Sequence, residues 1–144
     1  MNPVPSCVFV YGTLQRGEKR AALWPHPPLD VQWATTKGKL HDLGDYPALV
    51  DGTDSVLGEL WLIAGEDLPR TLQILDSIEG FAQGDVDLYV RQIVDCVKLS
   101  GEAQRAYTYR YANPNEIAGA PPVAAGPEGL VHWRRQDPQR LRLP

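Results

Sequence analysis

The chain has 144 residues, 43% of them hydrophobic and 22% charged, a composition typical of one globular domain. Its 14 basic and 18 acidic residues give a net charge of −4, which argues against a general nucleic-acid binder. No apolar run is long enough to span a bilayer and no secretory signal opens the chain, so we expect a single cytoplasmic domain over residues 1–144 with no membrane partner.

The most informative stretch lies near the N-terminus, where a β-branched and aromatic run over residues 7–11 predicts a strand. Alternation places two valines on one face and Phe9 and Tyr11 on the other. Gly12 then lets the backbone leave the strand in a conformation that side chains usually forbid. A tight turn after a buried strand is well suited to present backbone N–H groups to a ligand.

Strands and turn-rich segments alternate after this first turn. The segment over residues 15–28 is polar and broken by prolines, so no more than a short helical turn is expected there. A later strand is apolar on both faces except at Glu59, as in the centre of a sheet. The predicted elements are a helical turn at 18–23, a strand at 31–40, a loop at 42–50 and a strand at 56–63.

The clearest helix is predicted over residues 66–79, where leucine and isoleucine recur at helical spacing. Asp67 is suited to the N-cap position and Pro69 to the first turn. Gly80 is suited to the position just past the last turn, because glycine readily adopts the left-handed conformation found there. The helix is therefore expected to end beside Glu79.

Two strands and a proline-rich segment complete the chain. Residues 89–99 and 103–111 predict strands joined by a hairpin turn, with Tyr107 and two further tyrosines on one face of the second. From about residue 113 the chain is rich in proline, alanine and glycine, and we expect an irregular segment that wraps the domain. One good helix among many strands predicts an α+β fold with a mixed sheet curled into a barrel.

Cysteine and histidine give little support for chemistry of their own. Cys7 and Cys96 lie in predicted strands, and two small buried side chains are favoured over a disulfide or a catalytic thiol. His26, His41 and His132 have no ligand spacing, so no metal site is expected.

A phosphate-binding loop is an alternative use for the first turn. Gly12 and Gly17 have the glycine spacing of that motif. However, Glu18 stands where the motif needs lysine, and no hydroxyl residue for magnesium follows it. This alternative is therefore disfavoured.

Glu79 is the strongest candidate for chemistry. It falls in the last helical turn, where the helix dipole disfavours a carboxylate by up to ~1 kcal/mol. Its apolar neighbours add desolvation, so its pKa should rise, which suits general acid–base catalysis. The alternative is a solvated glutamate at a frayed helix end. Asp76 is expected to bond local backbone or a nearby loop, and Arg91 to pair with an acid such as Asp76 or Glu59.

Two stretches of the chain together resemble the γ-glutamylcyclotransferase-like family. Residues 8–14 end in Tyr-Gly-Thr-Leu, and residues 75–81 read Leu-Asp-Ser-Ile-Glu-Gly-Phe. Three shorter stretches match the family's pattern in the same order, at residues 44–49, 58–61 and 89–91. The resemblance covers roughly residues 7–111, and the branch that contains γ-glutamylamine cyclotransferase is the most similar.

The resemblance implies a small mixed β-barrel flanked by helices, without a metal or a cofactor. It also implies that the α-amine of a γ-glutamyl compound attacks its own γ-carbonyl, which releases 5-oxoproline and a free amine or amino acid. Glu79 would be the general acid/base. Tyr11, Gly12, Thr13 and Leu14 would hold the substrate through backbone N–H groups.

Three tyrosines are weaker candidates for contact with the substrate. Tyr107 is favoured over Tyr46 and Tyr89, and all three are also compatible with half-buried packing. The rival function is a small-molecule-binding protein on the same fold that is non-catalytic or catalyses another reaction. The sequence leaves open the amine half of the substrate and the oligomeric state.

Overall fold

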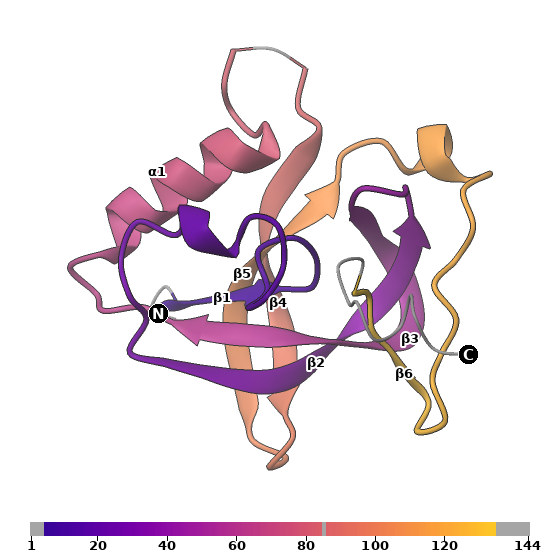
Figure 1. The fold of residues 1–144 in the computed structure, drawn as a ribbon, viewed down its shortest axis with the longest axis horizontal. Helices are drawn as coiled ribbons and strands as arrows, with labels where there is room; N and C mark the ends of the chain where they lie inside the picture. The colour runs from indigo at the N-terminus through magenta and orange to yellow at the C-terminus, as the bar shows by residue number, and fades with distance from the viewer. Residues whose placement is uncertain (1–4, 85, 135–144) are drawn as a thin grey trace.

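The computed structural model describes residues 5–84 and 86–134 (Figure 1). Strands dominate this part of the chain, and a single α-helix packs against them. The elements in chain order are β1 (Cys7–Val10), the 3₁₀ helix η1 (Ala21–Leu23), β2 (Asp30–Asp42), β3 (Pro47–Leu62), α1 (Leu68–Glu79), β4 (Tyr89–Lys98), β5 (Ala103–Tyr111), the 3₁₀ helix η2 (Pro114–Ile117) and β6 (Leu130–Val131).

Five of the strands close into a barrel. Their order is β1–β5–β4–β2–β3, and β1 also pairs with β3, which joins the two edges. β1 runs parallel to β5, with Val8 opposite Tyr107, whereas the other pairs in the ring are antiparallel. The short β6 adds a parallel strand to β3 outside the ring. These pairings confirm the predicted α+β fold with a mixed β-barrel.

The alternation predicted for β1 divides the core into two parts. Phe9 and Tyr11 face the barrel interior together with Leu60 of β3. The opposite face of β1 packs against α1, where Leu72 and Leu75 belong to the second apolar cluster. Strand β1 is therefore buried on both faces, and the turn that follows it emerges between barrel and helix (Figure 1).

The end of α1 follows the prediction more closely than its start. Asp67 takes the N-cap position as predicted, although its side chain makes no capping hydrogen bond, and the helix begins at Leu68 and not at residue 66. Gly80 ends the helix with a φ of 68°, and the N–H of Phe81 donates to the carbonyl of Asp76 at 2.9 Å. This Schellman-type turn fixes Glu79 as the last residue of the helix.

Strand β3 begins much earlier than predicted. Glycine and proline predicted a loop over 42–50, yet Pro47 is the first residue of a strand that runs to Leu62. Proline is tolerated at a first strand position, where its missing N–H removes no interior ladder bond. The turn between β2 and β3 therefore shrinks to a few residues, closed by the N–H of Leu43 donating to Tyr46 at 3.0 Å.

Cys7 on β1 and Cys96 on β4 are both free and buried, as predicted. Trp133 lies in the barrel core with only 3% of its surface exposed, and it anchors the described part of the segment after η2.

Candidate active site

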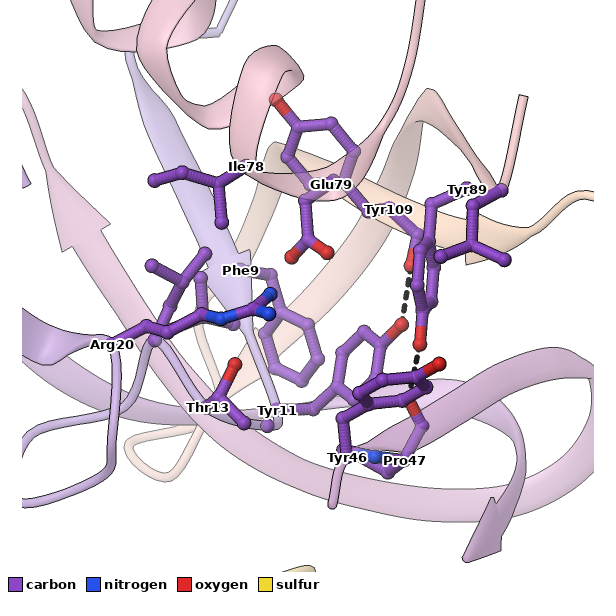
Figure 2. A pocket seen from close by; sticks show the side chains of 14 residues that line it. Phe9, Tyr11, Thr13, Arg20, Tyr46, Pro47, Ile78, Glu79, Tyr89 and Tyr109 are labelled. Carbon is purple, nitrogen blue, oxygen red and sulfur yellow. Dashed lines mark hydrogen bonds between the residues drawn. The ribbon is translucent and has the colours of Figure 1, made fainter. Parts of the chain in front are cut away.

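A pocket opens where the turn after β1 meets the end of α1 (Figure 2). Its volume is about 80 Å³. The lining comes from the turn after β1, the end of α1, and the starts of β3 and β4. The lining residues are Phe9, Val10, Tyr11, Gly12, Thr13, Leu14, Arg20, Tyr46, Pro47, Ile78, Glu79, Leu88, Tyr89 and Tyr109.

Glu79 points into this pocket from the last turn of α1 (Figure 2). Burial raises the pKa of Glu79 from 4.5 to about 7, and the positive charge of Arg20 opposes part of that rise. The predicted rise in pKa is thus confirmed, with desolvation as its main cause. Within the described part of the chain, no residue donates a hydrogen bond to the carboxylate. The carboxylate is therefore available to exchange a proton with a ligand.

The turn after β1 presents free backbone donors to the same pocket. The carbonyl of Gly12 accepts from the N–H and the side-chain amide of Gln15, at 3.1 and 3.2 Å. The carbonyl of Thr13 accepts from the N–H of Arg20 at 2.8 Å. In contrast, the N–H groups of Gly12, Thr13 and Leu14 have no acceptor among the described residues. Buried N–H groups normally find a partner, so these donors are suited to bind a ligand's oxygens.

Three tyrosine hydroxyls hold the pocket wall in place. Tyr11 donates to the carbonyl of Tyr109 at 2.5 Å, and Tyr89 donates to the carbonyl of Pro47 at 2.8 Å (Figure 2). Tyr109 donates in turn to the carboxylate of Asp76 at 2.6 Å. Burial raises the pKa of all three tyrosines far above neutrality. They are therefore neutral donors that fix the wall and do not exchange protons at ordinary pH.

The structure brings most of the predicted site residues together, but not Tyr107. Glu79 and the turn residues 11–14 line one pocket, and Tyr46 and Tyr89 join them. Tyr107 lies outside the lining, where the guanidinium of Arg91 packs 5.4 Å from its ring centre. The register of β5 explains this difference. Tyr107 is level with the middle of β1, and Tyr109, two residues later, reaches the pocket instead.

Asp76 and Arg91 connect α1 to the barrel. The Nη1 atom of Arg91 lies 2.8 and 2.9 Å from the two carboxylate oxygens of Asp76. The predicted pairing of Arg91 with Asp76 is confirmed. The expectation that the Asp76 carboxylate bonds local backbone or a loop is wrong, since its partners are side chains on β4 and β5. This ion pair ties the final turns of the helix, and thus Glu79, to the sheet.

The buried carboxylate of Glu59 holds the segment that follows the turn after β1. Glu59 is fully buried on β3 and accepts from the N–H of Arg16 at 2.9 Å and from its Nε at 3.0 Å. The indole N–H of Trp61 donates to the same carboxylate at 3.1 Å. The sequence indicated that Glu59 has a structural partner, because it is the single charged residue in an otherwise apolar strand. Arg20, by contrast, carried no such signal, because only the fold places it in the pocket.

Ionisation of Glu79 is expected to make the fold less stable as the pH rises. The carboxyl of the unfolded chain ionises near pH 4.5, whereas the folded one ionises near pH 7. Its contribution to stability is therefore complete below about pH 4.5 and is lost as the pH rises through about 7. Relative to the parent chain, Glu79→Gln should gain about 2–3 kcal/mol of unfolding free energy between about pH 5 and about pH 8. Urea denaturation at both pH values measures this gain, and a constant difference between the chains would contradict it.

Among the described residues, no group of three or more His, Cys, Asp or Glu side chains is arranged to hold a metal ion. In the same part of the chain, no helix has the length and apolar character needed to cross a membrane.

Comparison with known proteins gives a consistent set of matches. Residues 8–134 match the family model described as gamma-glutamyl cyclotransferase, AIG2-like. A Vibrio cholerae protein named "Putative gamma-glutamylcyclotransferase" is 43% identical over 72 residues, which cover 49% of this chain and 62% of that protein. The gamma-L-glutamyl-butirosin B gamma-glutamyl cyclotransferase of Niallia circulans is 33% identical over 106 residues, covering 72% of this chain and 65% of the relative. The matched regions thus span less than two thirds of either relative.

A solved structure extends the likeness to the fold. The crystal structure of an AIG2-like protein from Mus musculus superposes with a TM-score of 0.65 at 23% identity. The match covers 92% of this chain and 97% of the mouse chain. At this level of identity the likeness concerns the fold alone, and it supports the barrel topology described above.

Proposed function

The chain belongs to the gamma-glutamyl cyclotransferase, AIG2-like family, and from this we propose that it releases 5-oxoproline and a free amine or amino acid from a γ-glutamyl compound. One observation carries the proposal. A half-buried carboxylate with a pKa near 7, that of Glu79, shares a small pocket with the unpaired N–H groups of the turn after β1. An acid/base and a set of oxygen-binding donors are the two parts that this cyclisation needs.

The proposed reaction begins with the α-amine of the substrate, which is mostly protonated near neutral pH. Glu79 removes one proton, and the amine attacks the γ-carbonyl carbon to close a five-membered ring. The N–H groups of Gly12, Thr13 and Leu14 receive the carbonyl oxygen, which becomes negative, and the α-carboxylate. The C–N bond to the amine half then breaks as Glu79 gives its proton to the departing nitrogen. The ring nitrogen loses its second proton to the released amine, which leaves as an ammonium ion.

A single titrating residue is sufficient for this chemistry, because the nucleophile belongs to the substrate. Holding the amine and the carbonyl of one molecule close together replaces an attacking side chain. The proton taken in the first step is returned in the second, so the carboxyl ends in its starting state. A pKa near neutrality suits both steps, since the group must accept and donate with similar ease.

The direct test is to incubate the chain with γ-glutamyl amines and γ-glutamyl peptides and to quantify 5-oxoproline. Formation of 5-oxoproline together with an equal amount of free amine supports the proposal. If no compound of the panel is converted although some bind, the chain is a binding protein on the same fold.

The pH dependence of turnover gives a second check. Because Glu79 must start as the carboxylate, kcat/KM should rise about tenfold per pH unit below an inflection near pH 7. Steady-state rates from about pH 5 to about pH 8.5 measure this profile, with buffers of constant ionic strength. A profile without an inflection in that range would contradict the role given to Glu79.

A further inference from the structure

Arg20 is the one cationic side chain among the described residues that line the pocket. Its backbone is held across the turn, because its N–H donates to the carbonyl of Thr13 and its own carbonyl accepts from Leu23 at 3.0 Å. Figure 2 shows its guanidinium extended into the pocket toward the carboxylate of Glu79. A fixed positive charge therefore stands beside the group that exchanges protons.

The guanidinium of Arg20 has no protein partner among the residues that the structure describes. Within residues 5–84 and 86–134, nothing accepts a hydrogen bond from it, and no carboxylate lies within ion-pair distance. The positive charge of Arg20 lowers the pKa of Glu79, but no hydrogen bond joins the two side chains. Two other arginines differ in this respect, because Arg16 pairs with Glu59 and Arg91 pairs with Asp76. A five-donor group that faces a pocket without an acceptor is suited to bind an anion from outside.

The proposed cyclisation places the departing nitrogen beside Glu79, because this residue must protonate it. In a γ-glutamyl amino acid or peptide, that nitrogen is bonded to a carbon that carries a carboxylate or a peptide carbonyl. The carboxyl carbon of a γ-glutamyl amino acid is thus only two bonds from the nitrogen, and Arg20 lines the same pocket as Glu79. A neutral amine half would leave the guanidinium unpaired, and an amine half with a second ammonium would bring like charges together.

The α-carboxylate of the γ-glutamyl half has other donors. The unpaired N–H groups of Gly12, Thr13 and Leu14 can receive it together with the carbonyl oxygen. Arg20 thus remains for the other half of the substrate. Resting on the proposed function, we propose that Arg20 binds a carboxylate on the amine half and selects γ-glutamyl amino acids over γ-glutamyl amines that lack a carboxylate.

The test compares two substrates that differ only in this charge, γ-glutamylalanine and γ-glutamylalaninamide. The parent chain should convert the acid with a kcat/KM at least about tenfold higher than the amide. Arg20→Gln should reduce that preference to about twofold or less. Lys19→Gln, which removes an exposed neighbouring cation outside the pocket, should retain it. The ratio cancels any change that the loss of Arg20 causes in the pKa of Glu79, since both substrates meet the same carboxyl.

Two kinetic outcomes would overturn the inference. Parent rates on both substrates in Arg20→Gln would show that the guanidinium contacts neither half of the substrate. An equal loss on both substrates would assign it to the carboxylate that they share, on the γ-glutamyl half. In either case 5-oxoproline still forms, so the proposed function stands while the inference fails.

A binding measurement keeps the inference testable even without turnover. Calorimetry on Glu79→Gln, with and without Arg20→Gln, gives the Kd of the acid and of the amide. About tenfold tighter binding of the acid that disappears with Arg20 supports the inference. Equal Kd values for the two compounds would overturn it. Absence of 5-oxoproline from every parent-chain reaction would overturn the proposed function alone.

Discussion

Replacing Glu79 with glutamine is expected to lower kcat about a hundredfold to ten-thousandfold while the fold is retained. Glutamine keeps the size and polarity of the side chain but cannot accept a proton from the attacking amine. Nor can it return one to the departing nitrogen. The remaining rate reflects substrate positioning by the turn after β1, which the substitution leaves intact. Measuring 5-oxoproline release under saturating substrate separates this loss from weakened binding.

Glu66→Gln is the matched control for this loss. It makes the same chemical change at an exposed position just before α1, away from the pocket lining. It should leave kcat within about twofold of the parent value. Circular dichroism and urea midpoints should show that both variants fold. If Glu79→Gln turned over at the parent rate, the proton transfer assigned to this carboxyl would be wrong.

Gly58→Ala is expected to destabilise the barrel by about 3 kcal/mol, near the upper end for overpacking a core. A Cβ atom at this position would lie 2.5 Å from the carbonyl oxygen of Val10 and 2.7 Å from the ring of Phe9. The first of these atoms is backbone and cannot turn away. Strands β1 and β3 would have to separate at the pairing that closes the barrel, and the turn that carries the N–H donors would move with β1.

The control for this substitution is Gly65→Ala, since a Cβ there meets nothing within 4 Å. It should leave the urea midpoint almost unchanged, whereas Gly58→Ala should lower the midpoint with an unaltered slope. The activity of the folded fraction should also fall in Gly58→Ala. Equal stability of the two variants would show that the β1–β3 pairing accommodates the added Cβ atom more readily than the distances indicate.

Local sequence signals located the two halves of the candidate site. Alternating apolar residues defined β1, and the glycine after a leucine-rich stretch defined the end of α1 beside Glu79. Both features depend on short-range physics: the two-residue period of a strand and the left-handed conformation that Gly80 adopts. The rise in the pKa of Glu79 could be anticipated for the same reason, because its apolar neighbours are adjacent in the chain.

Strand register and long-range packing could not be predicted from these local signals. Tyr107 and Tyr109 share one strand face, and only the pairing of β5 with β1 decides that Tyr109 lines the pocket. Arg20 has no helical or strand period around it, so its place beside Glu79 depends on the path of the turn. The early start of β3 at Pro47 was not predicted, because the glycine, proline and aspartate residues around it are more typical of a loop.

The parallel pairing of β1 with β5 also has a consequence for how the molecule reaches its native state. The hydroxyl of Tyr11 and the carbonyl of Tyr109 are 98 residues apart in sequence, and Gln15 meets His132 across 117 residues. Such a high contact order slows folding, because long loops must close before these contacts can form. During synthesis, the first strand leaves the ribosome long before the strand that completes it. The turn after β1 therefore acquires its shape late, and a chaperone that shields apolar β1 during this interval should raise the yield of native protein.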